Sequence, residues 1–206
     1  MKQLRPALLL TAFFVLLTGL VFPASIWAIG RVALPDRAAG SLIRDSAGNI
    51  IGSKLLGQAF SRPEYFHPRP SAAGSGYDAA NSGGTNLGAT SSKLVDGIED
   101  DPSTKDVDEA YLGFRDLARA YRRENGLAPT TLIPADAATR SASGLDPDIS
   151  PANAELQAAR VARARGMDAG RVRGLVRDHT RPRTLGFLGE PRVNVLALNL
   201  ALDTAK

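Results

Sequence analysis

The 206-residue chain contains no cysteine. This absence excludes disulfide bonds, thiol nucleophiles and metal sites built on thiolates. Histidine is almost absent too, because only His67 and His179 occur, far apart in sequence and outside any ligand-spaced cluster. We therefore expect surface or hydrogen-bonding roles for both histidines, and we predict no metal site.

The chain also lacks a strong charge of either sign. Its 25 basic and 21 acidic residues leave a formal net charge of +4, without a basic stripe interleaved with aromatic side chains. That composition argues against nucleic-acid binding. Residues 88–93 resemble a phosphate loop only superficially, because the Walker-type spacing of glycine, lysine and hydroxyl residues is missing. No other set of residues suggests catalysis or a cofactor site.

A long uncharged segment, residues 6–30, dominates the N-terminal part of the chain. As a helix its 25 residues would be about 37 Å long, against a hydrocarbon core of about 30 Å. Trp27 suits a membrane interface, and a spanning helix tolerates Pro23 with a kink. We therefore assign residues 1–6 to a tail, 7–29 to a transmembrane helix and 31–206 to a soluble domain.

A cleaved signal peptide is the alternative interpretation of this segment. Its apolar region would span about 7–15 residues and end at a small-x-small site. The run here is longer, and its end offers only Ala28-Ile29-Gly30, a weak match. An uncleaved anchor is therefore favoured.

Counting charges does not decide the direction of the anchor, since Lys2 and Arg5 precede it and Arg31, Arg37 and Arg44 follow it. A short basic tail directly before a span usually stays inside, and long domains cross largely regardless of charge. We predict a cytoplasmic N-terminus and an extracytoplasmic soluble domain.

Proline and glycine divide the first part of the soluble domain. Two short apolar runs, 41–43 and 50–51, predict a hairpin with Gly48-Asn49 as a tight turn. Residues 61–93 are rich in proline and glycine, which disfavours a long helix or a central strand. Loops of this length are often functional, so we interpret 61–93 as an ordered binding loop.

Apolar spacing and terminal signals predict three helices, over 107–125, 151–165 and 168–178. Ser150 and Pro151 form the clearest helix start, and Gly166 supplies the stop. Residues 193–202 alternate with a period of two and predict a strand. The fold class is therefore an α+β soluble domain behind a single N-terminal transmembrane helix.

Two glycine-containing segments are candidates for contact with a partner. The first segment consists of Ser82, Gly83, Gly84, Thr85 and Asn86. Its adjacent glycines allow positive φ and a close approach of another chain, and an ordinary turn is the alternative. The second segment precedes the predicted helix 151–165 and includes Ser143, Gly144 and Asp146. Its hydroxyls and free amides can hold an anion, and a capping loop is the alternative.

Four polar side chains outside those segments are further candidates. Gln157 and Arg160 share one helix face at a spacing of three residues. Asn194 and Asn199 interrupt an apolar run, so each is expected to bond to backbone or to a partner chain.

Five motifs, in order, resemble those of the C subunit of the Kdp potassium-transporting ATPase, the KdpC family. They are 65–72 (YFHPRPSA), 82–88 (SGGTNLG), 143–151 (SGLDPDISP), 157–162 (QAARVA) and 189–203 (GEPRVNVLALNLALD). The N-terminal anchor matches as well, so the resemblance covers essentially the whole chain. Asp148 departs from it where the family often has histidine, and Ala142 where it often has glycine.

This resemblance implies an accessory, non-catalytic subunit of an inner-membrane complex that imports potassium at the expense of ATP. Its partners would be a P-type hydrolytic subunit, a channel-like potassium-binding subunit and a small membrane subunit. The family is described as acting in assembly and as a catalytic chaperone that raises the ATP affinity of the hydrolytic subunit, through which ATP would be reached. An independent membrane-anchored extracytoplasmic binding protein or hydrolase, using loop 61–93, is the alternative.

Overall fold

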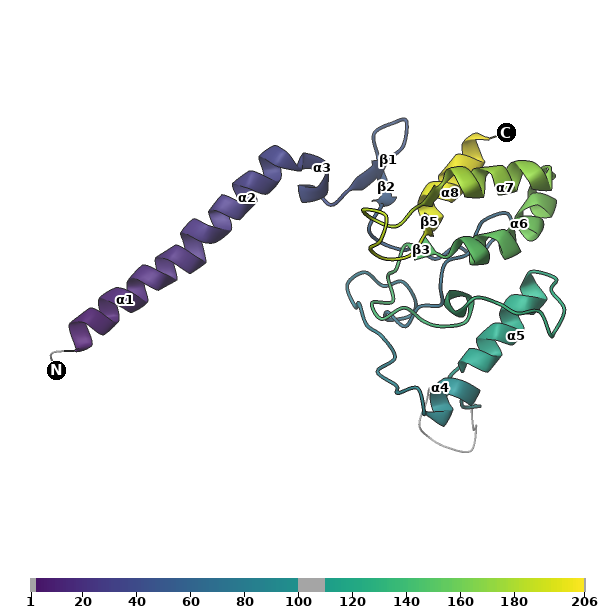
Figure 1. The fold of residues 1–206 in the computed structure, drawn as a ribbon, viewed down its shortest axis with the longest axis horizontal. Coiled ribbons are helices and arrows are strands. Elements are labelled where there is room, and N and C mark those ends of the chain that lie inside the picture. The colour runs from purple at the N-terminus through teal and green to yellow at the C-terminus, as the bar shows by residue number, and fades with distance from the viewer. Residues whose placement is uncertain (1–2, 100–109, 206) are drawn as a thin grey trace. The chain divides into compact units, whose positions relative to one another are not determined.

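The computed structural model describes residues 3–99 and 110–205 (Figure 1). The chain divides into two compact units, Met1–Ser53 and Lys54–Lys206. The first holds a long apolar helix, and the second is a mixed domain of helices and short strands. The predicted fold class is thereby confirmed.

One continuous helix, Leu4–Ala33, is long and apolar enough to cross a membrane. It consists of α1 (Leu4–Leu16), a π-helical turn η1 (Leu17–Val21) and α2 (Phe22–Ala33). Pro23 explains the wide turn, because proline lacks an amide hydrogen and its ring crowds the carbonyl four residues earlier. The amide of Phe22 accordingly reaches back five residues, to the carbonyl of Leu17.

The predicted hairpin follows this helix. After a short helix α3 (Pro35–Ala38), strands β1 (Leu42–Arg44) and β2 (Ile50–Ser53) pair antiparallel. The predicted tight turn at Gly48-Asn49 is wrong, because Asn49 already pairs with Asp45 through its carbonyl. The chain turns over residues 45–48 instead, where Gly48 has φ +88° and the Asp45 carboxylate accepts bonds from two backbone amides.

The second unit combines helices with a three-stranded antiparallel sheet in the order β3-β5-β4. Its elements are α4 (Ser92–Asp96), α5 (Phe114–Glu124), η2 (Ala135–Ala137), β3 (Asp148–Ile149), α6 (Pro151–Arg165), α7 (Ala169–Asp178), β4 (Thr180–Arg181), β5 (Arg192–Asn194) and α8 (Val195–Thr204). Helices α6, α7 and α8 gather on one side of this unit, apart from α4 and α5 (Figure 1). The predicted loop 61–93 contains no helix or strand over residues 61–91, and its last two residues begin α4.

The two helices with strong local signals form as predicted. The Ser150 hydroxyl accepts from the amide of Asn153 at 3.1 Å, and Gly166 ends α6 with φ +64°. Asp168 caps α7 by accepting from the amide of Arg171 at 2.9 Å. Local sequence therefore suffices to place α6 and α7.

Two other predicted elements need correction. The predicted strand over 193–202 is wrong: β5 ends at Asn194, whose side chain caps α8. The predicted 107–125 helix begins only at Phe114, because Tyr111 pairs through backbone with Ile98 and is held extended. The predicted start of that helix lies outside the described residues.

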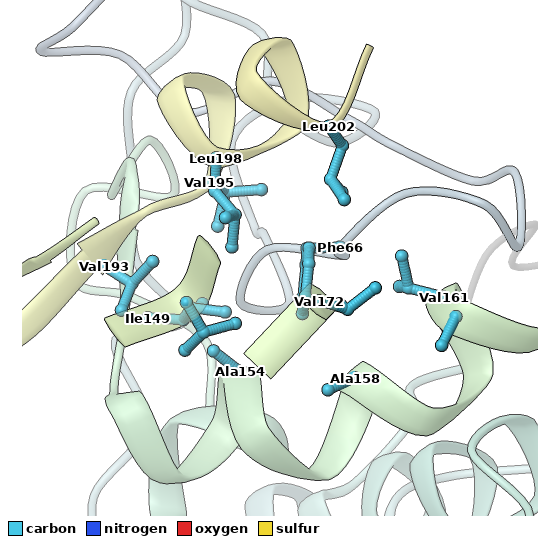
Figure 2. Close-up of a cluster of buried hydrophobic side chains, with 12 residues drawn as sticks. Phe66, Ile149, Ala154, Ala158, Val161, Val172, Val193, Val195, Leu198 and Leu202 are labelled. Atoms are coloured by element: carbon cyan, nitrogen blue, oxygen red, sulfur yellow. The ribbon is translucent and has the colours of Figure 1, made fainter. Parts of the chain in front are cut away.

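The core of the second unit joins α6, α7, α8 and the sheet around one loop residue. Phe66, fully buried, lies in the middle of the cluster (Figure 2). Side chains from α6, such as Val161, lie on one side of it, and those from α8, such as Leu198, lie on the other. The predicted binding loop, residues 61–93, thus also supplies a central core residue.

Candidate functional site

The loop around Phe66 is fixed by two buried side-chain amides. Asn199 accepts from the Phe66 amide at 2.8 Å and donates to its carbonyl at 3.0 Å. Gln157 does the same for His67, at 2.7 and 3.0 Å. Each amide therefore satisfies both backbone groups of one loop residue, as a neighbouring strand would.

Arg160 extends this polar network to the start of the loop. Its guanidinium donates to the carbonyls of Pro63 and Tyr65 and to the side-chain oxygens of Asn125 and Gln157, at 2.6–3.0 Å. Burial lowers the pKa of Arg160, and the carboxylate of Glu124, 3.9 Å away, counteracts that effect. With four acceptors, the buried charge is well satisfied.

A cavity of about 290 Å³ lies beside this network, between the loop and α5. His67 Nδ1 and Glu124 Oε1 meet there at 2.5 Å. The hydrogen bond from His67 lowers the pKa of Glu124 below its ordinary value, against the opposing effect of partial burial. Tyr77 also lines the cavity, and burial raises the pKa of its hydroxyl, which donates to the Arg69 carbonyl.

Arg69 supplies the cationic group of the cavity. Its Nη1 lies 2.8 Å from Asp146 Oδ2, while its buried Nε has no hydrogen-bond partner among the described residues. The cavity could thus hold a small polar group. His67 is occupied by Glu124 on one ring nitrogen and faces the Arg62 carbonyl at 2.9 Å on the other, so it is poorly placed to activate a nucleophile.

The two predicted glycine segments meet next to this cavity, in what we call the glycine junction (residues 82–84 and 141–144). The Gly83 amide and the Ser82 hydroxyl both donate to the Ser143 carbonyl, at 3.0 and 2.9 Å. A Cβ on Gly84 would lie 2.8 Å from the Ala142 carbonyl oxygen, and one on Gly144 only 2.7 Å from Ala73. The close approach expected of the adjacent glycines is made at Gly84, by a segment of the same chain.

The remaining predicted residues separate into exposed and buried groups. Asn86 is exposed with φ +53°, Thr85 is half-buried beside the junction, and Asp146 binds Arg69. Asn194 is buried and donates to the Lys54 carbonyl at 3.1 Å besides capping α8. The buried residues Gln157, Arg160, Asn194 and Asn199 thus hold loops and helix ends within the domain. Of the two roles expected for the asparagines, a bond to backbone or to a partner chain, both make the bond to backbone.

Sequence reasoning missed the cavity residues His67, Arg69, Tyr77 and Glu124 as a group. His67 and Arg69 stood inside the 65–72 motif, which was a signal for them. No sequence signal indicated Glu124, because it reaches the loop only through the packing of α5. In the described part of the chain no group of three His, Asp or Glu residues could hold a metal ion.

Comparisons with known proteins give one consistent family. A family model described as KdpC, the c chain of the K+-transporting ATPase, matches residues 4–204. A "Potassium-transporting ATPase KdpC subunit" from Caulobacter vibrioides is 48% identical over 203 residues, 98% of this chain and 93% of the relative. Proteins of the same name from Mycobacterium tuberculosis and Koribacter versatilis are 48% and 50% identical over 202 residues, 98% of this chain and 98% and 94% of the relatives.

Proposed function

Because the chain belongs to the KdpC family and is therefore a subunit of a K+-transporting ATPase, we propose that it serves the pump as a non-catalytic accessory subunit. In this role it assembles and stabilises the complex and raises the ATP affinity of the hydrolytic P-type subunit. The family match over residues 4–204 carries the proposal, since it includes the anchor and the whole domain.

The contacts of the polar residues support a non-catalytic role. Gln157, Arg160 and Asn199 form hydrogen bonds with the loop around Phe66, within the domain itself. A catalytic group needs access to a substrate, whereas these side chains are less than a tenth exposed. Such a network holds the loop rigid, and a rigid loop surface can be recognised by another subunit.

The orientation we propose places the N-terminus in the cytoplasm and the domain outside the inner membrane. The domain then cannot touch ATP in the cytoplasm. Its effect on ATP affinity would pass through membrane segments, with the helix Leu4–Ala33 docked against the channel-like and small membrane subunits. Neither nucleotide nor ion need bind this chain directly.

Removal of the chain tests the proposal. Complexes purified with and without it are compared for subunit content, potassium-stimulated ATP hydrolysis and the KM for ATP. Loss of other subunits from the purified complex indicates the assembly role, and a raised KM for ATP at unchanged subunit content indicates the chaperone role. Unchanged assembly, rate and KM would contradict the proposal.

A further inference from the structure

The hairpin between β4 and β5 holds three large apolar side chains in solvent. Leu185, Phe187 and Leu188 are 79%, 69% and 49% exposed and fall within four positions. The whole stretch 181–191 is exposed. Large apolar groups gathered on a surface mark an interaction site more often than single ones do.

The tip of this hairpin has a fixed backbone shape. Thr184 and Leu188 exchange two backbone hydrogen bonds, both of 2.9 Å. Between them Leu185 has φ +55° and Gly186 has φ +83°. Leucine is strained in the left-handed region, and such strain tends to persist where a position serves binding. We call residues 185–188 the apolar knob.

The charges around the knob are mostly compensated. Arg183 pairs with Glu190 at 2.6 Å, and Arg192 pairs with Asp148 at 3.1 Å. The Arg181 side chain is exposed and forms no hydrogen bond or ion pair among the described residues, although its charge acts on Asp148 at longer range. The hairpin therefore offers an apolar tip with one available guanidinium at its base.

We propose that the apolar knob inserts into an apolar socket on another subunit of the ATPase complex, with a carboxylate at the rim that receives Arg181. This inference rests on the accessory role proposed above. A lipid surface rewards apolar area and net positive charge and requires no fixed backbone shape. A preformed turn whose flanking arginines are mostly paired within the domain suits instead the centre of a protein interface, where apolar anchors fill pockets and ordering costs are low.

Photo-crosslinking in the assembled complex identifies the occupant. A benzoylphenylalanine replaces Phe187, and in a control chain it replaces Leu132, which is 91% exposed and lies far from the hairpin in sequence. We expect the Phe187 position to crosslink to a different subunit in high yield, and the Leu132 position to do so weakly. Adducts of the Phe187 position with lipid only, or with a second copy of this chain only, would overturn the proposal.

Substitution of the knob separates folding from assembly. Leu185→Gly relieves the positive-φ strain, so the full chain in detergent should be at least as stable as the wild type. In competition with wild-type chain for incorporation into the complex, Leu185→Gly combined with Phe187→Ser should lose about thirtyfold. Leu132→Ser should compete equally with wild type.

Equal incorporation of the Leu185→Gly/Phe187→Ser chain would overturn the knob proposal alone, provided that wild-type chain assembles. If the wild-type chain itself fails to join the complex, the accessory role fails with it. The melting temperature of each variant, measured by circular dichroism, shows that altered assembly does not stem from unfolding.

Discussion

At the scale of single residues, side-chain amides replace a missing strand. The backbone at Phe66 and His67 has no neighbouring strand, yet Asn199 and Gln157 satisfy both of its residues. That an asparagine in an apolar run would bond to backbone could be predicted from sequence. Its partner could not, because Phe66 lies 133 residues away and only the tertiary packing brings it near.

Replacing Gln157 by leucine tests this network. Gln157→Leu leaves the amide and carbonyl of His67 without partners, and an unsatisfied buried group costs about 1–3 kcal/mol. We expect the free energy of unfolding, from urea titrations of the detergent-solubilised chain, to fall by about 2–4 kcal/mol. Arg163→Ala, at an exposed position of the same helix, is the control and should change little. If Gln157→Leu lowered the free energy of unfolding no more than the control does, Gln157 would not have this stabilising role.

The glycine junction allows a closely matched comparison. Gly144 and Gly166 have similar angles, φ +68° and +64°, but a Cβ on Gly144 would meet Ala73 at 2.7 Å whereas one on Gly166 meets nothing within 4 Å. Gly166→Ala should cost about 1 kcal/mol from backbone strain alone. Gly144→Ala should cost about 1–3 kcal/mol more, because backbone at the junction must move. Equal losses in urea unfolding would show that the contact with Ala73 relaxes freely.

At the scale of elements, predictions succeeded where the signal was local. Ser150, Pro151 and Gly166 mark both ends of α6 within the sequence itself. The strand predicted over residues 193–202 was wrong, because leucine at alternate positions matches a strand while Leu198 and Leu202 also lie one turn apart on a helix. Asn194 was the overlooked signal, since its side chain caps the helix.

Two helix caps can be compared to test this assignment. Asn194→Ala removes the acceptor for the Ala197 amide and also the donor to the Lys54 carbonyl. Asp168→Ala, at the exposed cap of α7, removes only an acceptor. We expect about 1 kcal/mol of lost unfolding free energy for Asp168→Ala and about 2 kcal/mol for Asn194→Ala. If residues 195–202 formed a strand in solution, loss of the cap at Asn194 would have little effect on helicity measured by circular dichroism.

Helix α5 meets the loop through a pH-sensitive contact. Because the pKa of Glu124 is lowered in the folded state, the unfolded chain takes up the proton first as pH falls. The stability from this contact is complete above the unfolded pKa of about 4.3 and is lost as pH falls through the lower folded value. Unfolding free energy should therefore decline more steeply below about pH 5 in wild type than in Glu124→Gln. If the unfolding free energies of the two chains fell in parallel with pH, the lowered pKa of Glu124 would be contradicted.

At the scale of the whole molecule, the long apolar helix could be predicted from composition, since the uncharged run contrasts with everything after it. The boundary between the two units could not, because it follows Ser53, after the hairpin, and no change of composition marks it. The contents of the second unit could be predicted only in part. Its sheet joins β3, β4 and β5 through two or three residues each, too few to leave a periodic pattern. The α5–loop cavity depends on contacts between segments far apart in sequence, such as His67 with Glu124.

The orientation of the molecule can be tested because the chain has no cysteine. We expect Ser75→Cys, at an exposed position, to react with an impermeant maleimide added to intact cells whose outer membrane, if present, is permeabilised. Gln3→Cys should react only after lysis. Ala128→Cys, at another exposed position, controls for burial of Ser75 by a partner. Protection of both domain cysteines until lysis would place the domain in the cytoplasm.

The position of Phe66 at the centre of the core also bears on biogenesis. Its neighbours Leu198 and Leu202 are synthesised more than 130 residues later, so the core cannot close while the chain is still short. Contacts this distant in sequence form slowly, whereas the helix Leu4–Ala33 needs no distant residue. Membrane insertion therefore precedes folding of the domain. The newly made subunit would pass through a tethered, unfolded stage in which local chaperones or proteases decide its fate before it reaches the pump.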